Sequence, residues 1–361
     1  MPESPTAALH FRGHCVDTDT PVEFWTHDGL ITFEPVPGAD TVCDGGWITS
    51  GLVDAHNHVG IAPGLGVTLD QARGFARLDA RAGALLIREV GSPLDTHPLD
   101  ADPNGPRFIR SGRHIARTKR YLRGYGVELD DPDTLADEVR RQARVGDGWV
   151  KLVGDWIDRE VGDLAPLWTD AQLAAAAEAA HAEGARITAH IFGTDALHGV
   201  IAAGFDCIEH GTGLTDDLLA AMAQRDIALV PTLIQVENFP SIADGADRFP
   251  TYQSHMRALY AGAHDVFAHA VEAGVPIYAG TDAGGFVDHG RIVDEMVALT
   301  TIGLDAATVV AAATVGSREW LSGSTLGEGE RADLIVLDAD PRVDIETLRA
   351  PRVVVCGGAV L

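Results

Sequence analysis

The sequence is poor in basic residues. Its 27 Lys and Arg stand against 53 Asp and Glu, which gives a formal net charge of −26. Nucleic acids and anionic membranes require a basic surface on their partners, so this charge argues against both. The acidic residues are spread along the whole chain and therefore indicate solubility rather than a type of substrate.

Cysteine is also scarce. The four cysteines are scattered, with no CxxC pair, which favours reduced cytoplasmic thiols over a disulfide framework. The sequence has no apolar stretch long enough to cross a bilayer. Its first residues lack the basic start and apolar core of a signal peptide. We therefore expect a cytoplasmic protein.

Three common catalytic motifs are missing: the GxSxG elbow, the GxxxxGK[ST] phosphate loop and the HExxH helix. Nucleophilic serine chemistry therefore has no candidate. The 361 residues are 46% hydrophobic, with a mean hydropathy of +0.05, which is sufficient for a large core. This length suits a barrel that folds as one unit.

Metal-binding side chains follow short apolar runs that resemble strands. In a (β/α)8 barrel such strand ends meet at one face, where the active site is built. Strand alternation sends His56 and His58 to one side and Asn57 to the other, so two imidazoles can chelate a divalent ion such as zinc. The complete set is His56, His58, Lys151, His190, His210 and Asp282.

These segments resemble the amidohydrolase superfamily. They read GLVDAHNH (51–58), VKL (150–152), TAH (188–190), IEHGT (208–212) and GTDAG (280–284). The likeness is to the binuclear metal-dependent branch, which includes prolidase-like and imidazolonepropionase-related enzymes. Residues 327–338 are similar to the closing segment of that family.

The resemblance implies two divalent metal ions, zinc first, with manganese, cobalt or iron as alternatives. The two imidazoles of segment 51–58 and Asp282 would hold one ion, and His190 and His210 the other. Lys151 would join them. Because a free ammonium has no acceptor, Lys151 would first be N-carboxylated by carbon dioxide, as in the similar enzymes.

The expected reaction is hydrolysis of an amide C–N bond in a small substrate, such as a dipeptide or an N-acyl amino acid. Metal-activated water would attack, and Asp282 would carry the proton. A lactonase, a cyclic amidase or a deaminase on the same scaffold are alternatives, as is a non-catalytic binding protein. A small molecule is the expected partner, and homo-oligomerisation is left open.

The pattern of runs predicts an α/β fold. Strands and helices alternate as a (β/α)8 TIM barrel over residues 49–324. The two chain ends, 1–48 and 325–361, read as strands, which the resemblance assigns to a small β-sandwich beside the barrel. Helices are predicted at 169–183, with Thr169 as N-cap, and at 254–273 and 305–321.

Residues 107–123 contain no acidic residue, and the part after a predicted third strand is expected to lie over the site. Its basic residues would either bind a substrate carboxylate or form a solvated face. Phe192 stands where relatives often have a tyrosine, and His289 lies in the loop after the last strand. The candidate substrate-binding residues are Arg113, His114, Lys119, Arg120, Tyr121, Phe192 and His289.

Four residues next to the candidate ligands are assigned to other roles. Alternation turns Asp54, Glu209 and Thr281 away from the site, where they either orient imidazoles or pack outward. Cys207 is predicted to be a core residue.

Overall fold

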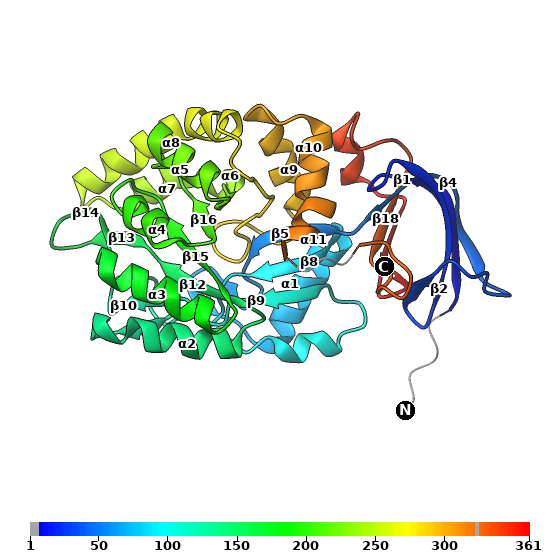
Figure 1. The fold of residues 1–361 in the computed structure, drawn as a ribbon, viewed down its shortest axis with the longest axis horizontal. Coiled ribbons are helices and arrows are strands. Elements are labelled where there is room, and N and C mark those ends of the chain that lie inside the picture. The colour runs from blue at the N-terminus through cyan, green and yellow to red at the C-terminus, as the bar shows by residue number, and fades with distance from the viewer. Residues whose placement is uncertain (1–6, 322–324) are drawn as a thin grey trace.

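The computed structural model describes residues 7–321 and 325–361. Residues 322–324, at the predicted junction between the barrel and the C-terminal strands, lie outside the described residues. The chain forms a large α/β body and, beside it, a sheet that contains both the first and the last strands (Figure 1).

Short parallel strands form the centre of the large body. They are β5 (Leu52–Asn57), β8 (Ala84–Glu89), β9 (Arg107–Arg110), β10 (Ile115–Arg117), β11 (Val127–Leu129), β12 (Trp149–Val153), β15 (Arg186–Ile191), β16 (Cys207–His210) and β17 (Ala228–Val230). One sheet has the order β5-β8-β9, and the other has the order β11-β10-β12-β15-β16-β17. The alternation of these strands with helices confirms the predicted α/β class.

Residues 276–283 connect the two parallel sheets. The N–H of Tyr278 bonds to a β17 carbonyl (3.1 Å), and the carbonyl of Ala279 accepts from a β5 N–H (2.8 Å). Pro276 has no N–H to add to a ladder, and only isolated bridges form here. The described residues therefore contain two parallel sheets and no continuous closed sheet of eight strands.

Helices surround the parallel strands (Figure 1). They are α1 (Leu69–Arg81), α2 (Leu135–Val145), α3 (Asp170–Ala182), α4 (Leu197–Ala203), α5 (Asp216–Gln224), α6 (Leu233–Val236), α7 (Phe239–Asp244), α8 (Pro250–Glu272), α9 (Ile292–Thr301), α10 (Ala306–Ala312) and α11 (Val315–Leu321). Single 3-10 turns occur at η1 (His97–Ala101), η2 (Pro132–Thr134) and η3 (Ile345–Arg349).

All three predicted helical regions are helical in the structure, but two of them differ from the prediction in their start or continuity. α3 begins after Thr169, which is its N-cap, as predicted, and which also forms a reciprocal capping box with Gln172. α8 begins four residues early, at Pro250, because proline is favoured in the first turn of a helix. The predicted helix 305–321 is wrong as a single element. It divides into α10 and α11 at Thr314, whose hydroxyl bonds to the Val310 carbonyl (2.6 Å).

Both chain ends contribute to one sheet of seven strands with the order β20-β19-β18-β4-β1-β2-β3. The predicted β-sandwich is not confirmed, because the strands of the two ends lie in this single sheet. Two short hairpins, β6–β7 and β13–β14, lie elsewhere. The bounds are β1 (Leu9–Cys15), β2 (Thr20–His27), β3 (Leu30–Thr32), β4 (Asp40–Ser50), β6 (Ile61–Ala62), β7 (Leu65–Gly66), β13 (Asp155–Asp158), β14 (Asp163–Pro166), β18 (Leu334–Leu337), β19 (Val353–Cys356) and β20 (Ala359–Val360).

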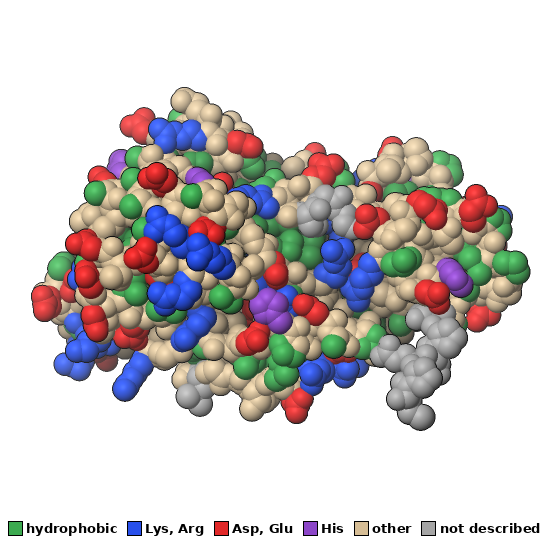
Figure 2. Space-filling model, turned by 60° about the horizontal axis from the view of Figure 1, so that its bottom comes forward, with side chains coloured by type: hydrophobic (Ala, Val, Ile, Leu, Met, Phe, Trp, Pro, Cys, Tyr) green, Lys and Arg blue, Asp and Glu red, His purple; other side chains and the backbone are tan. Residues whose placement is uncertain are grey.

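The surface carries its acidic side chains over both parts of the molecule rather than in one patch, on the face that Figure 2 shows. No helix in the described part of the chain combines the length and the apolar character that crossing a membrane requires.

Candidate metal centre

Three of the predicted ligands converge at the end of β5. The Nε2 atoms of His56 and His58 lie 3.2 Å apart. Asp282 Oδ1 lies 3.1 Å from His56 Nε2 and 3.2 Å from His58 Nε2. Both histidines are buried, and the Asp282 side chain is 17% exposed. The Asp282 carboxylate is therefore the most exposed part of this cluster.

The local backbone explains this convergence. A register shift in the β5–β8 pairing falls between Asp54 and Asn57. Asn57 turns away from the cluster, as predicted, and bonds to the carboxylate of Asp54 (2.9 Å). Asp282 has a left-handed backbone (φ 58°), and its N–H bonds to the carbonyl of His56 (2.8 Å). That bond fixes Asp282 beside the His pair.

A second pair of histidines lies next to this cluster. His190 Nδ1 and His210 Nε2 are 2.9 Å apart, and the ring of His210 lies 5.2 Å from that of His56. The other nitrogen of His210 bonds to the Thr232 hydroxyl at 2.7 Å. That bond turns Nε2 toward His190 and fixes the ring.

The prediction that Glu209 points away from the site is wrong. In β15 and β16, Glu209 is the register partner of His190, so the two side chains point to the same face. His210 reaches that face as well because its φ of 66° breaks the alternation. Asp54 and Thr281 bond to each other away from the cluster, as predicted (2.6 Å). Cys207 is buried in the core, as predicted.

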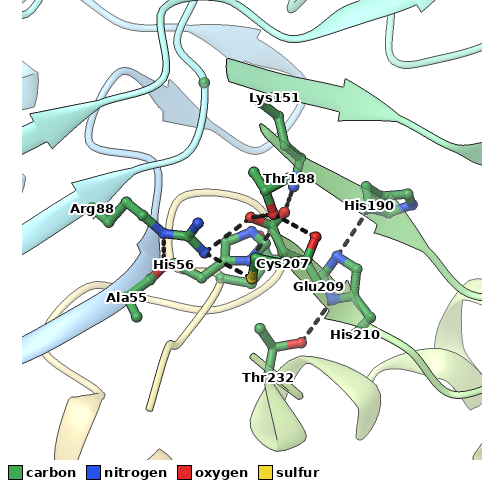
Figure 3. A network of polar contacts seen from close by, with 12 residues as sticks. Ala55, His56, Arg88, Lys151, Thr188, His190, Cys207, Glu209, His210 and Thr232 are labelled. Carbon is green, nitrogen blue, oxygen red and sulfur yellow. Dashed lines mark hydrogen bonds and ion pairs between the residues drawn. The ribbon is translucent and has the colours of Figure 1, made fainter. Parts of the chain in front are cut away.

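Lys151 lies beneath the ligands and is 1% exposed. Its Nζ contacts the carboxylate of Glu209, which also receives a hydrogen bond from Arg88 (3.1 Å) (Figure 3). Arg88 and Glu209 are both 0% exposed. A lone lysine in an apolar strand is therefore accommodated through a buried network of charges, as the cost of burying an unpaired charge requires.

Burial determines the protonation of the imidazoles. It lowers the pKa of His56, His190 and His210 well below the ordinary value for histidine, so these rings are neutral at neutral pH. Burial also lowers the pKa of Lys151 well below its usual value. For Asp282, burial acts in the opposite direction, but contacts with the surrounding imidazoles outweigh it and hold its pKa well below the usual range.

These residues fit a divalent cation. His58 Nδ1 lies 2.8 Å from the carbonyl of Gly91, which can only accept, so Nε2 presents a lone pair to the cluster. Zinc bonds of about 2.0–2.2 Å place neighbouring ligand atoms of a tetrahedron roughly 3.3–3.6 Å apart. The separations of 3.1–3.2 Å between His56, His58 and Asp282 lie just below the short end of that range. Neutral imidazole and carboxylate are also the forms that bind metal.

Three of the predicted substrate-binding residues lie beside this centre. The His114 ring is fully buried and stacks on His58 at 5.1 Å, with neither nitrogen hydrogen-bonded within the described residues. Tyr121 lies 5.1 Å from His114 and 6.0 Å from His190, between ring centroids. Phe192 lies 4.4 Å from His190. These rings form an aromatic wall on one side of the metal centre.

The other four predicted substrate-binding residues have partners elsewhere or face solvent. Arg120 bonds to Asp158 (2.8 Å) and to two carbonyls, and Arg113 to the carbonyl of Gly126 (3.1 Å). Lys119 is exposed. His289 bonds to Asp79 (2.9 Å), a residue of α1 that also contacts Asn57. These four do not converge on the ligand cluster.

Sequence reasoning missed three residues around the centre. Arg88 ends an apolar run, and the burial argument applied to Lys151 would have found it. Trp156, 5.3 Å from His190, extends the aromatic wall. Asp155 accepts the N–H of Phe192 (3.0 Å) and so positions that ring, and burial raises the Asp155 pKa to about 7. No local pattern indicates these last two roles.

The amidohydrolase family model matches residues 47–361, which is most of the chain. The chain belongs to the amidohydrolase family. It is therefore a hydrolytic enzyme, as the sequence predicted, and the predicted superfamily is confirmed. This family is typically metal-dependent, and the His56–His58–Asp282 cluster agrees with that property.

The amidohydrolase is similar to both uncharacterized and named proteins. An uncharacterized protein from Mycobacterium tuberculosis is 54% identical over 99% of this chain and 96% of its own. Ochratoxinase from Aspergillus niger is 26% identical over 69% of this chain and 58% of its own. The structure of a Xaa-Pro dipeptidase, with methionine in its active site, shares the fold at a TM-score of 0.80 and 23% identity, over 99% of this chain and 100% of its own.

Glu295 supports the turn beside His210, and its burial makes the stability of the protein depend on pH. Its fully buried carboxylate accepts the N–H groups of Leu233 (2.9 Å) and Ile234 (3.0 Å), next to Thr232. Burial raises the Glu295 pKa from 4.5 to about 8. Between these two values only the folded chain holds the proton, so stability must fall as the pH rises.

We predict that Glu295→Gln removes this pH dependence. Relative to the variant, the wild-type protein should be most stable below pH 4.5 and lose that advantage up to pH 8. The slope should reach about 1.4 kcal/mol per pH unit at most. Urea unfolding of both proteins across this pH range measures the free energy of unfolding and hence this slope. Parallel stability profiles would contradict the proton uptake.

Proposed function

We propose that this amidohydrolase is a binuclear metal-dependent enzyme that cleaves an amide C–N bond in a small substrate such as a dipeptide or an N-acyl amino acid. The observation that carries this proposal is the convergence of two buried ligand groups, His56–His58–Asp282 and His190–His210, with ring centres 5.2 Å apart. The family membership and the named relatives support hydrolysis of an amide.

Two divalent ions, zinc first, with manganese, cobalt or iron as alternatives, would be held by these groups. His56, His58 and Asp282 would hold one and His190 and His210 the other, with carboxylated Lys151 between them. When bound, such ions lower the pKa of water and polarise a carbonyl. The neutral imidazoles and the buried site favour this binding.

Asp282 would move the proton. Its carboxylate is the one oxygen acid in the cluster and keeps a solvent-exposed part, 17% of the side chain. It can take a proton from the attacking water and donate it to the leaving amine nitrogen. The left-handed backbone and the Asp282 N–H bond to His56 hold it at the required place.

The aromatic wall favours a substrate with an apolar group next to the scissile bond. Tyr121, Trp156 and Phe192 surround the His190 ring, with centroids at 6.0, 5.3 and 4.4 Å. Rings of this kind bury apolar surface and stack on planar groups. The partners of Arg113 and Arg120 lie within the protein, so recognition of a substrate carboxylate by this basic segment has less support.

We further infer that the two parallel sheets and residues 276–283 together make the (β/α)8 barrel of residues 49–324. Residues 1–48 and 325–361 would then form the composite second domain. The bonds of Tyr278 and Ala279 to β17 and β5 support this arrangement.

The reaction class is tested by a substrate screen. Metal-loaded protein should hydrolyse some N-acyl amino acids or dipeptides. Turnover should be faster for substrates that carry an aromatic or large apolar side chain. Lactones, cyclic amides and amine-bearing heterocycles serve as the comparison set. Activity confined to that set would replace the amide proposal with a lactonase, cyclic amidase or deaminase. Full metal content without any turnover would favour a binding protein.

The role of Lys151 is tested by metal content. Reconstitution of metal-free protein with zinc or manganese should give higher activity when bicarbonate is present. Lys151→Ala should lose at least one metal ion, because the remaining His190 and His210 offer few ligands for the second ion. Elemental analysis measures this loss, and added short carboxylic acids should restore part of it. Two tightly held ions in Lys151→Ala would reject the bridging role.

Asp282→Asn separates proton transfer from substrate binding. Turnover should fall on the order of a hundredfold or more, while the Michaelis constant changes little, because proton transfer is lost and recognition is kept. The comparison is made at equal metal occupancy, since Asp282 is also a ligand. Near-normal turnover at full occupancy would exclude Asp282 as the proton carrier.

A further inference from the structure

A group of charged side chains is completely buried beneath the candidate ligands. Arg88 and Glu209 are 0% exposed and Lys151 is 1% exposed. Figure 3 shows Glu209 between Arg88 on one side and Lys151 on the other, with His56 beside it. Burying charges is costly, so a group of this kind needs complete pairing or a functional reason.

One oxygen of Glu209 is anchored to the strands below. Oε1 accepts from the Thr188 hydroxyl (2.9 Å) and from Arg88 Nη2 (3.1 Å). Arg88 is itself fixed, because its Nε donates to the Ala55 carbonyl (2.6 Å) and its guanidinium lies over the Trp149 ring at 4.5 Å. The orientation of the Glu209 carboxylate is thereby set from below.

The other oxygen of Glu209 is turned to two of the candidate ligands. Oε2 contacts Lys151 Nζ and lies 3.6 Å from His56 Nδ1. Neither Oε2 nor His56 Nδ1 has a geometrically complete hydrogen bond within the described residues. One acceptor therefore faces two groups that can donate an N–H.

Carboxylation of Lys151 leaves one N–H on Nζ. The uncharged amine adds to carbon dioxide, the Nζ–C bond forms, one C=O electron pair moves onto oxygen, and one Nζ proton passes to water. The two carbamate oxygens are the ligand atoms, so the remaining N–H needs an acceptor on the opposite side. Glu209 Oε2 is already in contact with that nitrogen.

We propose that Glu209 is a positioning residue for two metal ligands. It accepts the N–H of carboxylated Lys151 and the Nδ1–H of His56, and it thereby turns the carbamate oxygens and His56 Nε2 toward the ions. Arg88 compensates the charge of Glu209 next to the anionic carbamate. This inference rests on the proposed function, because it assumes a bridging carbamate.

Glu209→Gln removes this arrangement with little change of volume. A glutamine has one acceptor oxygen, and its amide nitrogen only donates. If the oxygen faces Lys151 and His56, the amide meets Arg88, which also only donates. If the amide is turned the other way, it opposes the two ligand N–H groups. In both orientations, the amide N–H group of the glutamine therefore faces another N–H donor instead of an acceptor.

The carbamate itself is the first readout. The chain contains two lysines, Lys119 and Lys151, and Lys119 is exposed. In a Lys119→Arg background, 13C-labelled bicarbonate with metal should give one side-chain carbamate signal by NMR. Glu209→Gln should raise the bicarbonate concentration that gives half of the maximal signal roughly tenfold or more. This factor corresponds to the loss of one hydrogen bond to a charged group. The metal affinity of the variant should fall about 10- to 100-fold, as for other partners of metal ligands.

Two further variants keep the test decisive. Thr188→Val removes one anchor of Glu209 while Lys151 itself is unchanged. It should shift both readouts in the same direction as Glu209→Gln, but by a smaller amount. Glu138→Gln changes another buried carboxylate, on α2, that bonds to Gln142 (2.6 Å), and it should match the wild-type protein in both. This control separates a positioning effect from a general cost of substitution in the core.

The outcomes distinguish the two proposals. If the wild-type protein gives the carbamate and binds two ions, and Glu209→Gln does the same with equal affinities, the positioning role is overturned. If Glu209→Gln does not fold, Thr188→Val decides, and wild-type values in it overturn the role. If the wild-type protein itself gives no carbamate and binds no metal, the proposed binuclear function is overturned, and the positioning role falls with it.

Discussion

The buried guanidinium of Arg88 connects the two sides of the candidate centre. It donates to the carbonyl that precedes His56 on β5 and to Glu209, which precedes His210 on β16. Two strands from separate sheets are thereby linked by a guanidinium that is 0% exposed. Because a guanidinium stays charged and offers donors in a rigid plane, it can do this where a lysine could not.

Backbone strain then aims the side chains at the centre. His210, Thr232 and Asp282 adopt left-handed conformations, with φ of 66°, 50° and 58°, which are costly for residues other than glycine. His210 ends β16, Thr232 lies just after β17, and Asp282 lies in the segment 276–283 that connects the two parallel sheets. These positions let consecutive residues face the same space, so Glu209 and His210 both reach the site. Strain of this kind is expected where the surrounding structure compensates for it at functional positions.

Much of the centre could be predicted from the sequence because its chemistry is local to strand ends. The pairing of His56 with His58 and the outward turn of Asn57 follow from a few neighbouring residues. Outside the centre, the cap at Thr169 was predictable for the same reason. The direction of Glu209 could not be predicted, since it depends on the backbone angle of the next residue. The partner of Arg120, Asp158, lies 38 positions away, and such distant ion pairs leave no local pattern. The continuity of the sheets likewise depends on long-range pairing around residues 276–283.

The mixed seven-stranded sheet determines when this part of the protein can fold during synthesis. β4 pairs on one side with β1 and on the other with β18, which is almost 300 residues later in the chain. During synthesis from the N-terminus, β1 to β4 therefore leave the ribosome with the edge of β4 open until β18 (Leu334–Leu337) has been translated. Open edges pair readily with other strands, and long-range pairing is slow. Correct assembly of this sheet thus comes late, because the edge of β4 stays unpaired until β18 has been synthesised.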